Sequence, residues 1–340
     1  MSIKKIHVEK FTVFENIEIE FCSGINVIIG ENGTGKTHLL KLLYAGSFAH
    51  SGNSSILDGL FNKKTFESLK IINKITNDNE AKTGALEQIG IHSAHMNFIN
   101  PTHPDFGKPV SKLSDYSAIV TSDIPYESVF IPVREVLSLS NLPRVHKDYR
   151  KSLNLDKTML DIIEHAKTLV LDNPPELLKQ MADRLSTIIE GTAFYKDDEG
   201  TFWIQKHDGL QVPFDMEAEG FRKLGLLWLL LMNKSITENT VLLWDEPEAN
   251  LNPEAIPVLV NILLELARKG VQIFLSTHNY FFAKYLEALS TEGDSIAYHG
   301  LYKKNPVMCE SQNHFEALNN NSIIKQSINL YEAEIRKVMG

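Results

Sequence analysis

The feature that most constrains this chain is the segment GENGTGKT at residues 30–37. It follows the apolar run INVII and precedes the run THLLKLLYA, which has helical spacing. Its glycines allow the backbone to curl until several N–H groups face one point, and the start of the helix adds positive potential there. The order of strand, Gly-rich loop and helix is the context in which the pattern G-x-x-x-x-G-K-[ST] binds phosphates. The segment therefore predicts a phosphate-binding loop in an α/β fold.

The side chains of the predicted loop have separate expected roles. Lys36 is expected to reach the β- and γ-phosphates of ATP, and Thr37 to offer its hydroxyl to Mg²⁺. Backbone N–H groups come from the other members of the loop, which are Gly30, Glu31, Asn32, Gly33, Thr34 and Gly35. ATP and Mg²⁺ are therefore the predicted cofactors. A chance glycine-rich turn is the alternative, and the flanking strand and helix argue against it.

Two later segments place polar residues at the ends of apolar strands. VLLWDEPEANLNP, from residue 241, predicts a buried strand that delivers Asp245 and Glu246 to its carboxyl end, where α/β sheets bind ligands. Asp245 is expected to hold Mg²⁺, directly or through water, and Glu246 to act as the general base toward the attacking water. STHNYF places His278 at the end of a neighbouring strand, where imidazole can hydrogen-bond a γ-phosphate or that water. Lys36, Glu246 and His278 are thus the predicted catalytic residues, with a solvated acidic turn and a structural histidine as the alternatives.

The remaining sequence predicts one domain over residues 1–340 with an irregular middle. Alternating residues near the N-terminus predict two strands, each with one buried face. The second half alternates between helices and strands, as in a parallel sheet, with helices at 221–233, 253–269 and 280–289 and strands at 241–244 and 271–275. Residues 47–190 are interpreted as an insertion or side lobe, with a strand in 128–137 and helices within 155–189 that break at residues 173–175. A hairpin is predicted from AFYK and TFWIQ, a further strand near 296–302, and a closing helix near 330–338.

Composition narrows the class of protein and its surroundings. Lys and Arg total 34 against 43 Asp and Glu, a net charge of −9, which argues against coating nucleic acid by bulk charge. Only 2 cysteines occur, which is typical of a reducing compartment, and the N-terminus has no apolar run like that of a signal peptide. The longest apolar stretch, residues 224–232, is too short for a membrane span. We therefore expect a cytoplasmic protein without a membrane partner.

Two other clusters carry weaker hypotheses. The histidines His92, His95 and His103 lie in one loop-rich stretch, but no cysteine or acid completes a standard zinc spacing. A basic run, formed by Arg144, His146, Lys147, Arg150 and Lys151, could touch nucleic acid. Most such runs are solvated helix faces, so nucleic acid is left open as a partner.

The three motifs in this order, with a proline after Glu246, resemble those of the ABC ATPase superfamily. DEPEANL, NP and STHNYF look more narrowly like the RecF/OLD-like branch of ABC-type AAA ATPases, which includes ATPase subunits of bacterial anti-phage defence systems of the PARIS and Septu type. The resemblance covers residues 3–44 and 202–289. It implies a P-loop NTPase fold, an ABC-ATPase head with a mixed sheet, an antiparallel N-terminal β lobe and an irregular or helical insertion.

The resemblance also implies an ATP-sandwich homodimer, or a higher even-numbered oligomer. In such a pair a signature loop contacts the nucleotide of the opposite subunit, and its best match is EAEGFRKLG at residues 217–225, which places Gly220 at the phosphates. Ala218 stands where a serine is usual, and Asn252 where a histidine is common. Residues 248–251 correspond to the D-loop. A Q-loop glutamine is not placed, although Arg134 or Glu135 lies in a plausible segment.

The favoured function is a dimeric ATPase that senses or regulates a separately encoded effector in anti-phage defence. Residues 279–340 are too few for a nuclease fold and show no acidic metal-binding pattern, so the effector is expected on another chain. The alternative is a DNA-repair ATPase of the RecF and SMC type that clamps DNA. A transporter ATPase subunit is disfavoured by the long middle segment.

Overall fold

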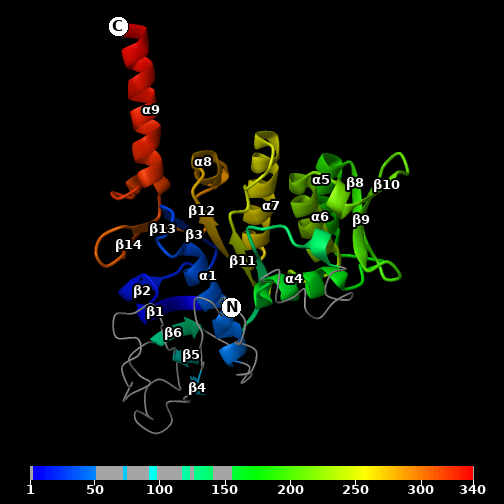
Figure 1. The fold of residues 1–340 in the computed structure, drawn as a ribbon, viewed down its shortest axis with the longest axis horizontal. Helices are drawn as coiled ribbons and strands as arrows, with labels where there is room; N and C mark the ends of the chain where they lie inside the picture. The colour runs from blue at the N-terminus through cyan, green and yellow to red at the C-terminus, as the bar shows by residue number, and fades with distance from the viewer. Residues whose placement is uncertain are drawn as a thin grey trace.

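The centre of the protein is a six-stranded sheet with the order β14-β13-β3-β12-β11-β7 (Figure 1). The computed structural model describes residues 3–50, 72–74, 92–97, 117–122, 126–140 and 155–339. The strands of this sheet are β3 (Ile25–Gly30), β7 (Glu127–Ile131), β11 (Thr240–Asp245), β12 (Gln272–Thr277), β13 (Ile296–Tyr302) and β14 (Met308–Gln312). All neighbours pair in parallel except β14, which is antiparallel to β13. The predicted mixed sheet is thereby confirmed.

A second sheet forms the N-terminal lobe. The predicted strands are β1 (Ile3–Phe11) and β2 (Phe14–Glu20), and they pair antiparallel as expected. The middle of the chain adds β6 (Ser117–Ser122), β5 (His92–Asn97) and β4 (Ile72–Lys74), in the sheet order β2-β1-β6-β5-β4. These three strands were not predicted. Their pairing joins residues far apart in the sequence, which local patterns do not report.

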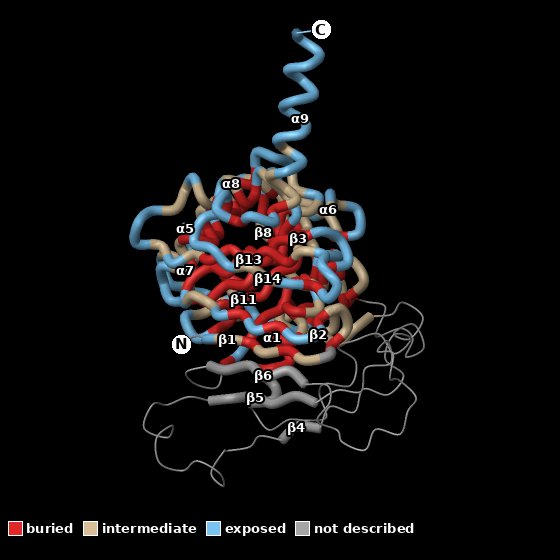
Figure 2. The backbone as a smooth tube through the Cα atoms, turned by 90° about the vertical axis from the view of Figure 1, so that its left-hand side faces the viewer, coloured by how far each residue is buried: buried red, intermediate tan, exposed pale blue. Residues whose placement is uncertain are grey.

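The central strands alternate their side chains between two apolar clusters. On β11, Leu242 and Trp244 belong to one cluster, whereas Val241 and Leu243 belong to the other. This period of two along strands buried on both faces explains why they read as continuous apolar runs. Figure 2 shows the buried residues gathered along the central strands. The sheet therefore needs a cover on each face.

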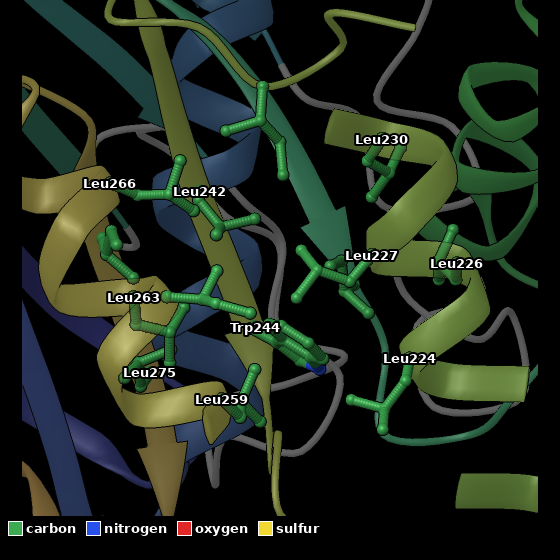
Figure 3. Close-up of a cluster of buried hydrophobic side chains, with 14 of the residues drawn as sticks. Leu224, Leu226, Leu227, Leu230, Leu242, Trp244, Leu259, Leu263, Leu266 and Leu275 are labelled. Atoms are coloured by element: carbon green, nitrogen blue, oxygen red, sulfur yellow. The ribbon is translucent and has the colours of Figure 1, made fainter. Parts of the chain in front are cut away.

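Helices provide that cover. On one face lies α1 (Lys36–His50) with the N-terminal lobe. The other face is covered by α6 (Glu219–Met232), α7 (Ile256–Arg268) and α8 (Tyr280–Leu289), whose buried residues belong to the same cluster as Leu242 and Trp244. Figure 3 shows Leu242 and Trp244 between leucines of α7 and α6. Short 3₁₀ turns are η4 (Leu137–Leu139), η5 (Phe214–Met216), η6 (Pro253–Ala255) and η7 (Phe315–Ala317). The predicted alternation of helix and strand in the second half is confirmed.

The side-lobe helices also form where the sequence predicts them. They are α4 (Lys157–Lys167) and α5 (Glu176–Ile189), with the predicted break between them. The following hairpin is β8 (Gly191–Lys196) and β9 (Thr201–Lys206), extended by β10 (Gln211–Pro213). Buried residues of α4 and α5 join the same cluster as α6. These helices consequently pack on α6, one of the helices that cover the central sheet. The limits of the insertion, residues 47–190, stay a prediction.

The last helix differs most from expectation. α9 (Ser322–Met339) begins eight residues before the predicted start at 330, and none of its residues is buried. Figure 1 shows it projecting away from the rest of the molecule. Its packing on the core is limited to Ile323 and Ile324 in the first turn, which are only partly buried, so the sequence carries too weak a period to predict those turns. Within the described ranges, no helix combines the length and apolar character needed to cross a membrane.

We predict that Leu227→Ala lowers the free energy of unfolding by about 2–5 kcal/mol, because it opens a cavity between α6 and β11. Leu227 is 0% exposed. The matched control is Leu210→Ala, at a side chain that is 59% exposed, which should change stability by less than about 0.5 kcal/mol. Chemical denaturation of both variants measures the difference, and equal losses would contradict the packing described for α6.

Candidate functional site

The loop that joins β3 to α1 has the curled backbone that a phosphate cradle needs. Gly33 and Gly35 have φ of 81° and 92°, a left-handed conformation that favours glycine. At Gly35 a Cβ atom would also lie 2.5 Å from a ring carbon of Phe14 on β2. The Thr34 hydroxyl donates to the Glu31 carbonyl over 2.8 Å, which closes the turn. The N-terminal lobe thus packs directly against the loop.

Lys36 directs its charge into this loop. Its Nζ donates to the carbonyl of Gly30 at 2.8 Å and to that of Glu31 at 3.2 Å, and the residue is 7% exposed. Burial lowers the pKa of this ammonium, while Glu246, Asp245 and Glu248 favour its charged form. A phosphate placed in the loop would offer such a desolvated cation strong charge-assisted hydrogen bonds.

Thr37 and Asp245 meet although 208 positions separate them. Thr37 Oγ1 donates to Asp245 Oδ2 over 2.7 Å, and Ser276 Oγ donates to the other carboxylate oxygen. The parallel register places Asp245 opposite Ser276, and β12 pairs with β3 on its other side. A threonine hydroxyl and a carboxylate are hard oxygen donors of the kind that Mg²⁺ prefers, so this pair fits the predicted ion. Ser276 was missed, although its place at the end of an apolar strand was a usable signal.

Glu246 and His278 also lie together. His278 Nδ1 is 3.0 Å from Glu246 Oε1. Glu246 has a φ of 49°, which is uncommon for a residue other than glycine and marks functional or strained sites. Its side chain is 22% exposed and that of His278 is 55% exposed. The pair therefore sits at the rim of the site, where water can reach both groups.

The predicted signature loop opens α6. Ala218 is the N-cap residue and makes no side-chain capping hydrogen bond, so the absence of the usual serine leaves the helix start without a hydroxyl. A Cβ at Gly220 would lie 2.7 Å from the Asn250 carbonyl oxygen. Gly220 thus lies close against the predicted D-loop of its own chain. Its nearest neighbours belong to that segment and not to the phosphate loop.

Several charged side chains are buried behind the site, and their contacts were not predicted. Glu248 accepts from the Thr277 hydroxyl over 2.6 Å, and burial raises the pKa of its carboxyl group. Lys223, on α6, is 1% exposed and donates to two carbonyls of the segment after β11. Arg222 and Glu135 form an ion pair of 3.3 Å. Sequence patterns cannot show such contacts, because the partners come together only through packing.

A cavity of about 510 Å³ adjoins the loop. Gly30, Glu31, Asn32 and His278 line one side, and the first turns of α9 line the other. The projecting helix therefore begins at the edge of the candidate site. The position of α9 beside the candidate site was not predicted.

The remaining predicted clusters lie outside the described residues. His103 and the basic run at 144–151 are not described, nor are the side chains of His92 and His95. Across the part of the chain that is described, no group of three or more His, Cys, Asp or Glu residues could hold a metal ion. The zinc and nucleic-acid hypotheses for these clusters stay untested.

Comparison with protein families identifies the domain. A profile of the family described as "AAA domain, putative AbiEii toxin, Type IV TA system" matches residues 107–283, just over half of the chain. The chain belongs to this family of AAA domains. A second profile, described as "AAA domain", matches residues 5–92, which include the phosphate loop. The ATPase class predicted from the motifs is confirmed at this level.

Curated relatives of this AAA domain are DNA replication and repair proteins named RecF. The protein from Exiguobacterium sp. is 30% identical over 101 residues, which cover 26% of this chain and 27% of the relative. The protein from Oceanobacillus iheyensis is 45% identical over 51 residues, which cover 15% of this chain and 14% of the relative. The matches thus span about a quarter of the relatives' length or less.

Among solved structures, the AAA domain is similar to two SMC heads. One, bound to the C-winged helix domain of ScpA, is 11% identical with a TM-score of 0.49. The match covers 93% of this chain and 98% of the SMC head. The other, from Thermotoga maritima, is 13% identical with a TM-score of 0.44 and coverage of 92% and 99%.

We predict that Lys36→Ala weakens binding of Mg²⁺-ATP by about 10- to 100-fold. This factor corresponds to the loss of a charged hydrogen bond that contributes roughly 1.5–3 kcal/mol to the binding free energy. The control is Lys303→Ala, which removes a lysine that pairs with Glu31. The side chain of Lys303 is 58% exposed. It should change affinity less than about threefold, because exposed pairs contribute little. Calorimetry measures both, and unchanged affinity in Lys36→Ala would mean that the loop is not the nucleotide site.

Proposed function

We propose that this AAA domain binds Mg²⁺-ATP and hydrolyses it to ADP and phosphate. The observation that carries the proposal is the 2.7 Å hydrogen bond between Thr37 and Asp245, which joins the phosphate loop to the acidic strand. In this proposal Lys36 and the N–H groups of residues 30–37 hold the phosphates, while Thr37 and Asp245 hold Mg²⁺. The ion would neutralise phosphate charge and orient the γ-phosphoryl group.

Glu246 is the proposed general base. The oxygen of a water attacks the γ-phosphorus, the bond to the β–γ bridging oxygen breaks, and the water's proton passes to the Glu246 carboxylate. His278, within 3.0 Å of that carboxylate, would hold the water or a γ-phosphate oxygen. The exposure of both side chains supports this role, because the attacking water must reach them.

The proposed working unit is a two-fold pair that encloses ATP. Gly220 of one subunit would face the phosphate loop of the other, and the N–H groups at the start of α6 would donate to the γ-phosphate. The N-cap residue Ala218 makes no side-chain capping hydrogen bond, which leaves N–H groups at the start of α6 able to donate to such an anion.

We predict that Glu246→Gln retains ATP binding but lowers turnover by about 100-fold or more, because the amide keeps the shape and loses the proton acceptor. ATP-bound dimers should then accumulate. The control is Glu254→Gln, the same change at an exposed carboxylate in η6, which should hydrolyse normally. Phosphate release and light scattering with ATP measure both effects. Wild-type turnover in Glu246→Gln, or a mutant that stays monomeric with ATP, would contradict the proposal.

We further propose that the ATP-bound pair regulates a separately encoded effector in anti-phage defence. The matching family, whose description names a toxin and a TA system, supports a two-component arrangement. ATP can drive such a switch only by binding one conformation better than another. The contact surface is proposed on the side lobe, where Leu169 and Val170, between α4 and α5, are 82% and 37% exposed.

We predict that Glu246→Gln, purified from the native host with its neighbouring genes, captures the effector and that Lys36→Ala does not. Adding Leu169→Asp to Glu246→Gln should abolish capture, because a charge cannot enter an apolar interface. Leu210→Asp, at another exposed leucine, is the matched control and should retain it. Mass spectrometry identifies the partner. DNA cleavage by this chain alone, without any neighbour, would contradict regulation through a second protein.

The second candidate function is an ATP-dependent clamp on DNA. The identity to RecF proteins of Exiguobacterium sp. and Oceanobacillus iheyensis favours it, whereas the net charge of −9 argues against it. The same trapped variant separates the two functions. ATP-dependent DNA binding that weakens with salt, without capture of a protein, would favour the clamp.

A further inference from the structure

A buried lysine joins the start of α6 to the backbone of the proposed general base. Lys223 Nζ donates to the carbonyl of Glu246 at 3.0 Å and to that of Ala249 at 2.9 Å. The residue is 1% exposed, so its ammonium group is held away from water. A buried cation is costly unless its hydrogen bonds are made, so the loss of either contact would destabilise the buried ammonium group.

The turn that Lys223 holds is conformationally unusual. Glu246 and Asn250 have φ of 49° and 64°, and neither is glycine. Such a backbone persists only where the surroundings over-determine it. The N–H of Glu246 donates to the Ser276 carbonyl at 3.1 Å, and its carbonyl accepts from Lys223 and from the N–H of Ala249. Both sides of the Glu246 backbone are therefore fixed, one by β12 and the other by α6.

Electrostatics keep the lysine in place. Burial lowers the pKa of Lys223, and the carboxylates of Glu248, Glu219, Glu246 and Asp245 oppose that effect. Gly220, one turn earlier on α6, packs within van der Waals reach of the Asn250 backbone, where no larger residue fits. The first turn of α6 and the turn after β11 are consequently in contact at two points.

The neighbouring residue points to a different segment. Arg222 pairs with Glu135 in the loop after β7, and Glu135 also accepts from the N–H of Ser138 at 3.2 Å. Adjacent basic residues on one helix turn thus hold two separate loops at the edge of the central sheet. Of these two basic residues, Lys223 donates to the backbone of Glu246 and Arg222 pairs with Glu135, so the two can be tested separately.

We propose that Lys223 is a positioning residue that makes the first turn of α6 and the backbone of Glu246 move as one unit. The inference rests on the proposed function, in which the N-terminus of α6 meets the γ-phosphate of the opposite subunit. Formation of that contact would set the position of α6. Because Lys223 is hydrogen-bonded to the Glu246 carbonyl, the general base would then shift together with α6. Hydrolysis then depends on pairing, while Lys223 itself touches neither ATP nor water.

The test compares Lys223→Met and Lys223→Arg with the wild-type chain. Methionine has a similar length but no donor, so Glu246 loses one of the contacts that hold its backbone. A misplaced catalytic group costs on the order of 100-fold, so we expect kcat to fall about 10- to 100-fold. Affinity for ATP and dimer formation with ATP should change less than about threefold, since the phosphate loop is untouched. Arginine retains charge and donors and should restore most of the lost kcat.

The matched control is Lys284→Met, the same change at a partly exposed lysine paired with Glu287 on α8. It should retain the wild-type kcat. Should Lys223→Met fail to fold, Lys223→Leu, which also lacks a donor, takes its place with the same expectations. A kcat within twofold of wild type in the Met or Leu variant would overturn the inference, as would equal losses of kcat, ATP affinity and melting temperature, which indicate a merely structural role. A wild-type chain that does not hydrolyse ATP would instead overturn the proposed function.

Discussion

The parallel register of β3, β12 and β11 is the constraint on which the rest of this structure depends. It places Ile29 opposite Thr277 and Ser276 opposite Asp245, so the carboxyl ends of three strands reach one edge of the sheet. The phosphate loop, the acidic pair and the histidine segment follow those ends directly. A shift of one residue would turn each strand's side chains to the opposite face, so the two apolar clusters hold this register.

The apolar frame also explains the electrostatic character of the site. Lys36, Asp245, Glu248 and Lys223 are all at least nine-tenths buried. Buried charges are tolerated where they are mutually compensated and hydrogen-bonded. Lys36 and Lys223 donate to backbone carbonyls, and Asp245 and Glu248 accept from hydroxyls. The same burial that makes these groups costly gives their interactions a low effective dielectric, in which a bound phosphate would be held strongly.

Prediction from the sequence was most successful where local patterns and tertiary packing agree. β3, β11 and β12 are short apolar runs bounded by turns, and the proline break between α4 and α5 has a local steric cause. It failed for β4, β5, β6 and β14, whose pairings depend on distant partners. It also set the start of α9 too late, because no residue of that helix is fully buried and its packing on the core is limited to Ile323 and Ile324. The contacts of Lys223 and of Ser276 belong to the same class of tertiary information.

The sequence by itself determined the phosphate loop and the residues at the ends of its neighbouring strands, because spacing, glycine conformation and strand period are local properties. Only the tertiary structure decided that Thr37 meets Asp245, that Glu246 meets His278, and that α6 is tied to the backbone of Glu246 by Lys223. Those contacts join residues between 23 and 208 positions apart. Their formation depends on how the covered sheet brings strand ends and helix starts together, a cooperative outcome of burying both faces at once.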